Sequence, residues 1–533
     1  STTRTTPSSA RSLRAAPPPR VRERGETVAD LARWRADALV VAAALLPLAL
    51  FAAREWQIAG AWGFPLDDSW IHLHFARNLA AGAGFSYNPG VPVAGSTAPL
   101  WTVLLGAGAL VASPSLAMAK FVGIAAAVAA ALLTRRAALA WGARDGAAAL
   151  AAVTLSWMGP MAWGALSGME VALAALLVAG ALLAHARDRT LACAACAALA
   201  VLARPEALLL VPFLVAARAL TVQRVALFTV VTLVVVAPAV LFSLWTAGTP
   251  YPATAAAKVE GGLVGWLGGV REPATLTWLT RPAVFGWQWI VWLATIHWLL
   301  PAALAPTLVL VGKRAGRALG LVALALVAHP IGMALLAPYR GPAFQEGRYS
   351  IHLLPLVVLV LAVALGSRPT SPAHAAPPAA PRRAFPRAVA AAVWLTIAAA
   401  ALVPAATRYA WAVQNINAMQ VHLGYWVDAQ LPKSARIAVN DIGAIAFFSR
   451  REIIDLMGLV TPDIIPYRRR GETGVMEYVA ETCPDYVIIF PVWFPRLAAS
   501  RETLEPIYRV RLEHNEVAGA AEMVVYRLLR CAV

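Results

Sequence analysis

Long apolar runs separated by short polar or basic connectors dominate the chain between residues 38 and 404. A helix needs about 20 apolar residues to cross a bilayer, and runs near this length recur throughout. Inside lipid such a run must satisfy its own backbone hydrogen bonds, so the pattern predicts a polytopic α-helical membrane protein. About eleven spans are expected, at residues 38–53, 97–112, 116–134, 146–163, 169–186, 190–217, 225–245, 286–311, 319–337, 349–366 and 388–404.

The pattern changes after about residue 405, where short apolar runs alternate with Gly, Pro and charged residues. Four of these runs have the composition of β-strands, at residues 436–441, 452–456, 485–490 and 522–527. We therefore expect a C-terminal soluble α/β domain at residues 405–533, after a transmembrane module at residues 38–404. An odd number of spans places this domain on the membrane face opposite the N-terminus.

Residues 1–37 are rich in Arg, Ser, Thr and Pro and are predicted to form a disordered, basic, cytoplasmic tail. They do not resemble the short charged region and cleavage site of a signal peptide, so the first apolar run is interpreted as a retained helix. This helix leaves the cytoplasm, and residues 54–96 form the first extracytoplasmic loop.

Basic connectors at residues 218–224 and 313–317 and a Pro/Arg-rich linker at residues 367–387 favour the cytoplasm. Counting back from them puts residues 246–285 and 338–348 outside. Simple counting also puts Arg135, Arg136 and Arg144 outside, against the same rule. The run 190–217, interrupted by Arg204-Pro205-Glu206, can be one span or two short ones, so the topology of residues 113–218 stays open at this stage.

Composition supports the membrane class, since 60% of the residues are hydrophobic, 14% are charged and the mean hydropathy is +0.65. The net charge is +17, but the basic residues lie between apolar runs, which indicates topology rather than nucleic-acid binding. Cys193 and Cys196 form a CxxC pattern inside an Ala-rich run, where a packed helix is the favoured interpretation over a metal or redox site. Cys483 and Cys531 lie near the C-terminus.

Two adjacent carboxylates, Asp67 and Asp68, follow the first span. Ile71, Phe75 and Leu79 recur at four-residue steps after them, which predicts an amphipathic helix along the membrane surface with an Asp at its N-terminus. One Asp can serve as an N-cap, but two exceed what capping requires. A helix N-terminus also keeps a carboxylate ionised, as a general base must be, so capping and catalysis both stay open.

Two histidines lie on this expected helix. His72 follows Asp68 by four residues and can share its face, whereas His74 points in a different direction. The pair therefore does not predict a His-x-His metal chelate.

Several segments together resemble the GT-C class of integral-membrane glycosyltransferases, in particular bacterial members grouped with mannosyl- and arabinofuranosyltransferases. The Asp pair after the first span is the most specific of them. The likeness covers most of residues 38–460 and includes Asp67-Asp-Ser-Trp-Ile, Ala76-Arg-Asn-Leu, Gly84-Phe-Ser-Tyr-Asn-Pro-Gly, Gly95-Ser-Thr-Ala-Pro-Leu-Trp, Ser167-Gly-Met-Glu, Ala203-Arg-Pro-Glu, Gly248-Thr-Pro-Tyr-Pro-Ala-Thr with Lys258, Gly347-Arg-Tyr with Pro355, Asp441-Ile-Gly-Ala and Asp455-Leu-Met-Gly-Leu.

The resemblance implies a multi-pass enzyme of the bacterial plasma membrane that transfers a sugar from a polyprenyl-phosphate carrier to a glycan, lipid or protein acceptor on the extracytoplasmic face. It implies Asp67 as the general base, with Asp68 as the alternative or a supporting partner, in a single-displacement, inverting reaction. Membrane lipid is an expected partner and nucleic acid is not. The expected substrate-binding residues are His72, His74, Arg77, Glu170, Arg204, Lys258, Arg348 and Tyr349.

Each cation that could bind the leaving phosphate also has a plainer, purely structural interpretation. Lys258 can be a solvated loop residue, Arg348 can anchor its helix at the interface, and Arg204 can form a structural ion pair with Glu206 or Glu170. Two further acids, at positions 441 and 455, can simply shape turns of the C-terminal domain.

No cofactor is required by the sequence, although the Asp pair and a lipid phosphate could share a divalent cation. Two other functions explain the spans. One is a transporter or flippase of lipid-linked saccharides, for which internal repeats are the expected sign. The other is a non-catalytic envelope-assembly protein that kept the fold.

Overall fold

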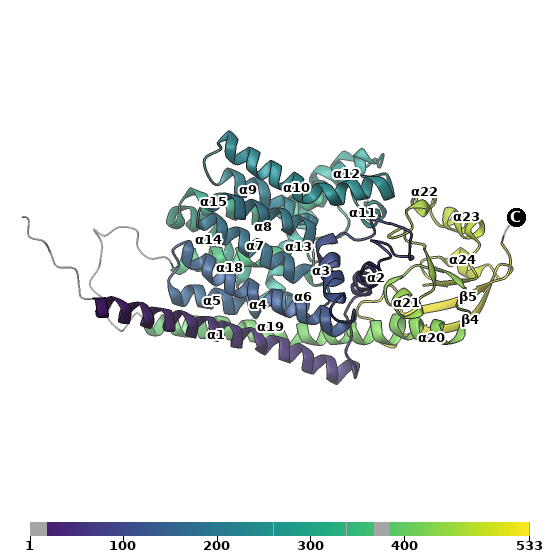
Figure 1. Ribbon diagram of the computed structural model, residues 1–533, viewed down its shortest axis with the longest axis horizontal. Helices are drawn as coiled ribbons and strands as arrows, with labels where there is room; N and C mark the ends of the chain where they lie inside the picture. Colours follow the sequence, from purple (N-terminus) through teal and green to yellow (C-terminus); the bar gives the residue numbers. More distant parts are fainter. Residues whose placement is uncertain (1–18, 260, 337, 367–383, 532–533) are drawn as a thin grey trace, which may run out of the picture.

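The computed structural model describes residues 19–259, 261–336, 338–366 and 384–531. Its elements form a helical bundle, and a small mixed α/β domain sits at one end of that bundle (Figure 1). The predicted fold class is therefore confirmed in its main features.

Two long helices run side by side along one edge of the bundle, α1 (Pro19–Ala59) and α19 (Ala384–Ile416) (Figure 1). The prediction of a disordered tail is wrong for residues 19–37, because α1 already includes them. That segment holds five Arg, three Ala and two Glu residues, which are good helix formers. Residues 1–18 of the tail lie outside the described residues, as does most of the linker 367–387.

Within the described residues, six helical segments are long and apolar enough to cross a membrane, or eight if each bent helix pair counts as one span. The eleven-span count is not reached by this criterion and stays a prediction. The six segments are Arg33–Ala59, Leu116–Ala140, Val222–Ala247, Arg317–Leu336, Phe344–Gly366 and Arg387–Gln430; the two pairs are Asp145–Ser156 with Gly159–Leu166, and Leu276–Ile296 with Leu300–Ala315.

The expected span at residues 97–112 is a short helix, α3 (Pro99–Ala109). Eleven residues rise about 16 Å, roughly half of the hydrocarbon thickness. The helix α4 (Leu116–Ala140) then runs back along the bundle, and Arg135 and Arg136 near its end bond to Asp37 of α1, at 2.6 and 3.1 Å. These two arginines therefore lie at the same end of the bundle as the N-terminal half of α1, which removes the conflict left by simple counting.

The run 190–217 is a hairpin of two short arms, α8 (Thr190–Ala203) and η1–α9 (Pro205–Ala216). Pro205 ends the first arm, since the residue before a proline disfavours helical geometry, and Arg204 is extended there (φ −144°, ψ 115°). The two outer ends of the hairpin meet at Arg224, which bonds to the hydroxyl of Thr190 at 3.2 Å and the carbonyl of Leu214 at 3.0 Å. Arg204 consequently lies at the tip of the hairpin, deep in the structure.

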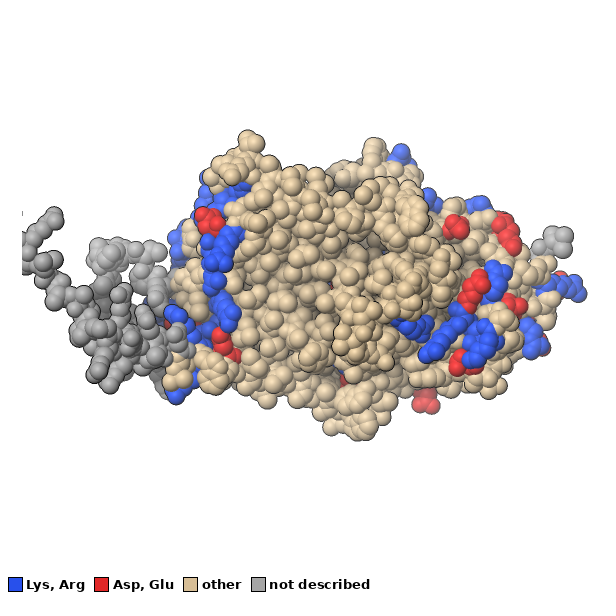
Figure 2. Space-filling view, viewed as in Figure 1, with Lys and Arg blue, Asp and Glu red and all other residues tan. Residues whose placement is uncertain are grey.

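Charged side chains collect in two zones separated by a broad surface almost without charge (Figure 2). One zone lies at the bundle end farthest from the C-terminal domain and is mostly basic, and the other covers that domain (Figures 1 and 2). Such an uncharged belt is the surface expected to face lipid.

The remaining bundle helices complete the walls. They are α5 (Asp145–Ser156), α6 (Gly159–Leu166), α7 (Val171–Ala186), α10 (Val222–Ala247), α13 (Arg281–Ile296), α14 (Leu300–Ala315), α15 (Arg317–Ala323), α16 (Ala325–Leu336) and α18 (Leu354–Gly366), with the short α11 (Ala253–Lys258) and α12 (Gly262–Leu267) near the C-terminal domain (Figure 1).

The C-terminal domain is built on a five-stranded sheet of order β2-β1-β3-β5-β4, parallel among its first three strands and antiparallel beyond. All four predicted strands are confirmed, as β1 (Arg436–Val439), β2 (Glu452–Asp455), β3 (Tyr486–Ile489) and β5 (Glu522–Leu528). The edge strand β4 (Leu504–Arg511) was not predicted, because Pro506 and its charged residues mask the strand pattern. The helix α19 continues through a π-helical turn into α20 (His422–Gln430), so the backbone has no break at residue 405.

The predicted helix after the Asp pair is α2 (Asp68–Ala80), but it does not lie on an open membrane surface. It packs between α3 and α21 (Gly443–Ser449) of the C-terminal domain (Figure 1). Its four-residue apolar face, Ile71 and Phe75, enters the core of that domain, while the ring of Trp70 on another face lies 4.8 Å from that of Phe448. The apolar periodicity was interpreted correctly, but its partner is protein rather than lipid.

Candidate active site

A cavity of about 790 Å³ lies between the bundle and the C-terminal domain. The residues before α2 form part of its wall, together with the segment 344–348 that precedes α18, the C-terminal part of α19 and the loops after β1 and β2. Acidic and basic side chains share it: Asp67, Asp68, Glu346, Asp441 and Glu516 on one hand, and Lys258, Arg340, Arg348, Arg408 and Arg468 on the other.

Asp67 occupies the N-cap position of α2, yet its side chain does not cap that helix. Its carboxylate instead accepts hydrogen bonds from the backbone N–H groups of Gly443 (2.5 Å) and Ala444 (2.7 Å), at the start of α21. Burial raises the pKa of Asp67 to about 6, although these two backbone donors and a hydrogen bond with Asp441 lower it. The first-loop carboxylate is thus attached to the C-terminal domain and titrates near neutral pH.

Asp441 is the acidic neighbour of Asp67 and was considered from sequence only as a turn residue. Burial raises the pKa of Asp441 well above its ordinary value, and the nearby charge of Asp67 adds to this effect. Gln420 donates a hydrogen bond to its carboxyl at 2.6 Å. Asp441 therefore binds a proton more readily than an ordinary aspartate, and it can share that proton in a hydrogen bond with the Asp67 carboxylate.

Asp68 faces the cations. Arg348 donates a hydrogen bond to its carboxylate at 2.8 Å, and the Nζ of Lys258 lies 3.9 Å from the same oxygen. Although burial opposes ionisation, Lys258 and Arg348 hold the pKa of Asp68 below its usual range. Asp68 is therefore ionised and orients two cations at the cavity wall.

A smaller cavity of about 170 Å³ lies beside the first one and shares Asp68, Lys258 and Arg348 with it. The Arg204 guanidinium lies over the ring of Tyr349, at 4.6 Å, and Arg348 donates a hydrogen bond to the hydroxyl of that tyrosine at 3.1 Å. The hairpin tip and the segment that precedes α18 thus meet Asp68 here.

Arg204 forms ion pairs with Glu170 and Glu206, as the plainer interpretation expected. Glu170 in turn lies 3.5 Å from the Nε2 of His72. The Nη2 of Arg204 and the Nε of Arg348 are nevertheless buried without a hydrogen-bond partner in the described part of the chain. Because buried polar groups are normally paired, these two donors indicate room for an anionic ligand.

The other two predicted binding residues lie elsewhere. The Nε2–H of His74 donates a hydrogen bond to the carbonyl of Tyr87 (2.9 Å), and burial lowers the pKa of His74 to about 3. Arg77 donates to the carbonyl of Phe447 at 2.7 Å. Neither lines the two cavities; both fasten α2 to the loop after it and to α21.

Several cavity residues were missed from the sequence. Arg408 of α19 pairs with Glu346 at 2.7 Å, while Arg340 lines the cavity from a loop and Arg468 from the end of the short helix α22 (Ile465–Arg468). A basic residue inside the last apolar helix was a usable signal for Arg408, but nothing local marks Arg340 or Arg468. Asp455, the other acid named from sequence, accepts backbone N–H bonds from Met457 and Val460 and shapes its turn as expected.

Within the described residues, no group of three or more His, Cys, Asp or Glu side chains is arranged to hold a metal ion. Both oxygens of Asp67 already accept backbone hydrogen bonds, and an oxygen of Asp68 faces two cations. A divalent cation at the Asp pair therefore stays an untested expectation.

Comparison with known proteins gives a family model for one part of the chain and a fold for most of it. A family described as "Domain of unknown function (DUF8728)" matches residues 412–526. No curated protein sequence matches the chain. The relation of this chain to characterised proteins therefore depends on similarity of fold.

Two groups of solved structures are similar over most of the chain. The oligosaccharyltransferase of Archaeoglobus fulgidus in its apo form has a TM-score of 0.54 and 13% identity, covering 85% of this chain and 69% of its own. ArnT from Cupriavidus metallidurans has a TM-score of 0.54 and 14% identity in its apo state, covering 92% of this chain and 97% of its own. In its structure bound to undecaprenyl phosphate the values are 0.53 and 13%. The fold is that of the GT-C glycosyltransferases, which confirms the resemblance at the level of fold.

Proposed function

We propose that this protein is a glycosyltransferase that moves a sugar from a polyprenyl-phosphate carrier to an acceptor, on the membrane face that carries the C-terminal domain. The observation that carries the proposal is a single cavity that holds Asp67 beside Asp68, Lys258 and Arg348. A carboxylate can accept the proton of an acceptor hydroxyl, while cations stabilise the phosphate that leaves. The ArnT structure named above binds undecaprenyl phosphate, which supports this class of donor.

Asp67 is the proposed general base. Its pKa of about 6 lets it be ionised at neutral pH and still take a proton in the transition state. In the proposed step the acceptor oxygen bonds to the anomeric carbon, its proton passes to Asp67, and the bond from that carbon to the phosphate oxygen breaks. The leaving group is the polyprenyl phosphate, and a single displacement inverts the anomeric centre.

The phosphate is proposed to bind at Arg348, Lys258 and Arg204. The unpaired Nε of Arg348 and Nη2 of Arg204 supply donors that no protein group uses among the described residues. Asp68 does not serve as the base in this proposal, because its ion pairs make it a weak one. Asp68 instead positions Arg348 and Lys258.

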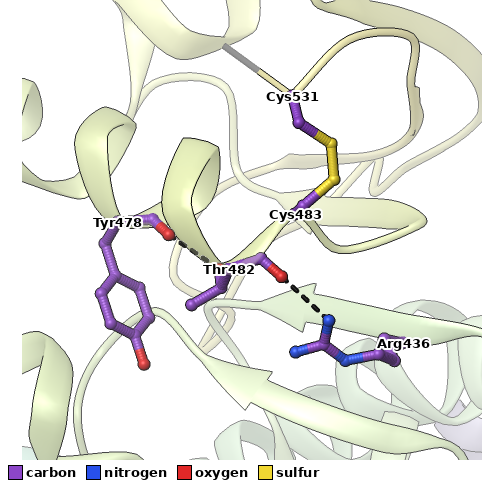
Figure 3. Close-up of a disulfide and its surroundings, with 5 residues drawn as sticks. All are labelled: Arg436, Tyr478, Thr482, Cys483 and Cys531. Carbon is purple, nitrogen blue, oxygen red and sulfur yellow. Dashed lines mark hydrogen bonds between the residues drawn. A yellow bond between two sulfur atoms is a disulfide. The ribbon is translucent and has the colours of Figure 1, made fainter. Parts of the chain in front are cut away.

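Two features support an extracytoplasmic site. The C-terminal domain carries a disulfide between Cys483 and Cys531 (Figure 3), and such bonds form in oxidising compartments. The opposite end of the bundle carries the mostly basic zone (Figure 2), as cytoplasmic ends do.

The proposal is tested by sugar transfer with the purified full chain and a panel of radiolabelled polyprenyl-phosphate sugars, with membrane extract as acceptor. We expect transfer by the wild type and at least a hundredfold loss in Asp67→Asn, with donor binding retained. Asp463→Asn is the matched control, because Asp463 is exposed and lines neither cavity.

Transfer unaffected by Asp67→Asn would overturn the assignment of the base. Donor binding by the wild type without transfer would favour the alternatives of a flippase or an assembly protein. A vesicle assay that measures movement of the lipid-linked sugar between leaflets separates those two.

A further inference from the structure

A second large groove lies at the opposite end of the bundle, far from the Asp pair. It has a volume of about 1080 Å³ and is bounded by α5, α14, α18 and the first turns of α19. This is the end that carries the mostly basic zone (Figures 1 and 2). The mechanism proposed above uses none of its residues.

The rim of the groove is basic. Arg144 comes from the start of α5, Lys313 and Arg314 from the last turn of α14, and Arg387 from the start of α19. Among the described residues that line the groove none is acidic, and Asp145, next to Arg144 in the chain, is not part of its wall. Four cations that converge from three helices create a strong local preference for an anion.

Below the rim the walls are apolar. Leu150, Val358 and Leu361 line them, and the indole of Trp394 bonds to the hydroxyl of Thr154 at 3.1 Å at the deeper end. This bond leaves the inner surface without a polar group that a hydrophilic ligand could use. The occupant must therefore be anionic at one end and apolar at the other.

The linker that joins α18 to α19 does not fit this description. Its residues 367–383 include three arginines, at positions 368, 382 and 383, and no Asp or Glu. The linker therefore carries charge of the same sign as the rim.

We propose that this groove binds an anionic phospholipid of the leaflet opposite the active site, with the phosphate at the basic rim and the acyl chains along the apolar walls. Basic pockets between transmembrane helices recognise anionic lipid headgroups in this way. Bound lipid would hold the ends of α5, α14 and α19 together where protein contacts leave a gap.

Native mass spectrometry of the detergent-purified full chain tests the proposal. The protein is mixed with equal amounts of phosphatidylglycerol and phosphatidylcholine, which share acyl chains and differ in net charge. We expect one phosphatidylglycerol per protein, preferred at least tenfold, and a tenfold loss of this binding in R144Q/K313Q/R387Q. Arg314 is left intact because it donates a hydrogen bond to the carbonyl of Ala364.

The matched control is R187Q/R189Q/R317Q, which removes three exposed cations outside the groove. Its lipid binding is expected to equal that of the wild type, and equal melting temperatures of the two variants would exclude misfolding. Equal loss in both variants would overturn the proposal in favour of general surface attraction. So would no preference for phosphatidylglycerol, displacement of the lipid by glycerol phosphate alone, or a lipid-free dimer that covers the groove.

Discussion

The carboxylate of Asp67 accepts a hydrogen bond at 2.5 Å from the backbone N–H of Gly443, which lies 376 residues later in the chain. Asp67 belongs to the loop after the first span, and Gly443 begins α21 of the C-terminal domain. The orientation of the proposed base is therefore set by that domain. If the same domain binds the acceptor, the acceptor hydroxyl would be positioned relative to Asp67 without a separate conformational change.

This contact predicts the effect of Gly443→Ala. A Cβ at this position would lie 2.1 Å from the backbone oxygen of Asp67 and 2.8 Å from its carboxyl carbon, so Asp67 must move. We expect at least a tenfold fall in kcat with donor binding retained, and a loss of about 1–3 kcal/mol in stability from overpacking. Gly286→Ala, with no atom within 4 Å of the added Cβ, is the control in transfer and thermal unfolding assays. Equal activity of the two variants would contradict the role of the contact.

The pKa of Asp67 predicts a pH dependence of transfer. With the pKa at about 6, the ionised base is lost below that pH, so kcat should fall about tenfold per unit below 6 and be level above. Asp441→Ala removes a hydrogen bond that lowers this pKa, so the inflection should move to higher pH. Asp441→Asn keeps an N–H donor and should move it less. A flat pH profile in the wild type would argue against Asp67 as the base.

The raised pKa of Asp67 also predicts that stability falls as the pH rises, whereas transfer activity increases. The pKa of Asp67 is raised from 3.8 when unfolded to about 6 when folded, so the folded state binds the proton more tightly. Its contribution to stability is complete below pH 3.8 and is lost as the pH rises through about 6. The melting temperature of Asp67→Asn should show less of this change between pH 4 and 7 than that of the wild type.

The pair of Asp68 and Arg348 predicts a positive coupling in a double-mutant cycle. Arg348→Gln leaves Asp68 with Lys258 alone at 3.9 Å; because the Asp68 side chain is 30% exposed, losing this charged hydrogen bond is expected to cost about 1–3 kcal/mol. We expect the Asp68→Asn/Arg348→Gln variant to lose less stability than the two single losses added together. Donor binding should remain at least tenfold weaker in both variants that lack Arg348. Strict additivity would show that the pair is not coupled.

The disulfide predicts a sensitivity to reduction that is confined to the C-terminal domain. It joins residues 48 positions apart and ties the end of α23 (Glu472–Thr482) to the segment after β5 (Figure 3). Cys483→Ser should lower the stability of the domain by about 2–4 kcal/mol and abolish its response to dithiothreitol. Cys193→Ser/Cys196→Ser is the control, since these cysteines are free and lie within α8.

The hydrogen bonds that Asp67 and Asp68 already accept predict that sugar transfer does not depend on a divalent cation and survives chelation. Both oxygens of Asp67 accept backbone N–H groups and Asp68 faces Arg348, so little capacity is left to complete an oxygen-ligand site. We expect activity within twofold of the untreated protein after EDTA treatment and desalting. Loss of transfer that Mn²⁺ or Mg²⁺ restores would show that a cation takes part.

Much of the fold was predictable because it depends on local pattern. Apolar run length predicted a helical membrane module, short β-type runs between Gly, Pro and charged residues predicted four of the five strands, and the four-residue spacing of Ile71 and Phe75 predicted α2. Errors arose where local pattern is ambiguous. An apolar run of sixteen residues at 97–112 contains a helix of only eleven, and the interrupted run at 190–217 folds back on itself.

By itself the sequence determined the fold class, four of the five strands of the C-terminal domain and the position of an Asp pair after the first span, because each depends on residues close together in the chain. Tertiary structure alone decided that Asp67 bonds to α21 while Asp68 faces Arg348. It also decided that Asp441 lies beside Asp67 and that Arg204 lies over Tyr349. Neighbouring carboxylates receive different pKa values from partners hundreds of residues away, and only the folded chain specifies those partners.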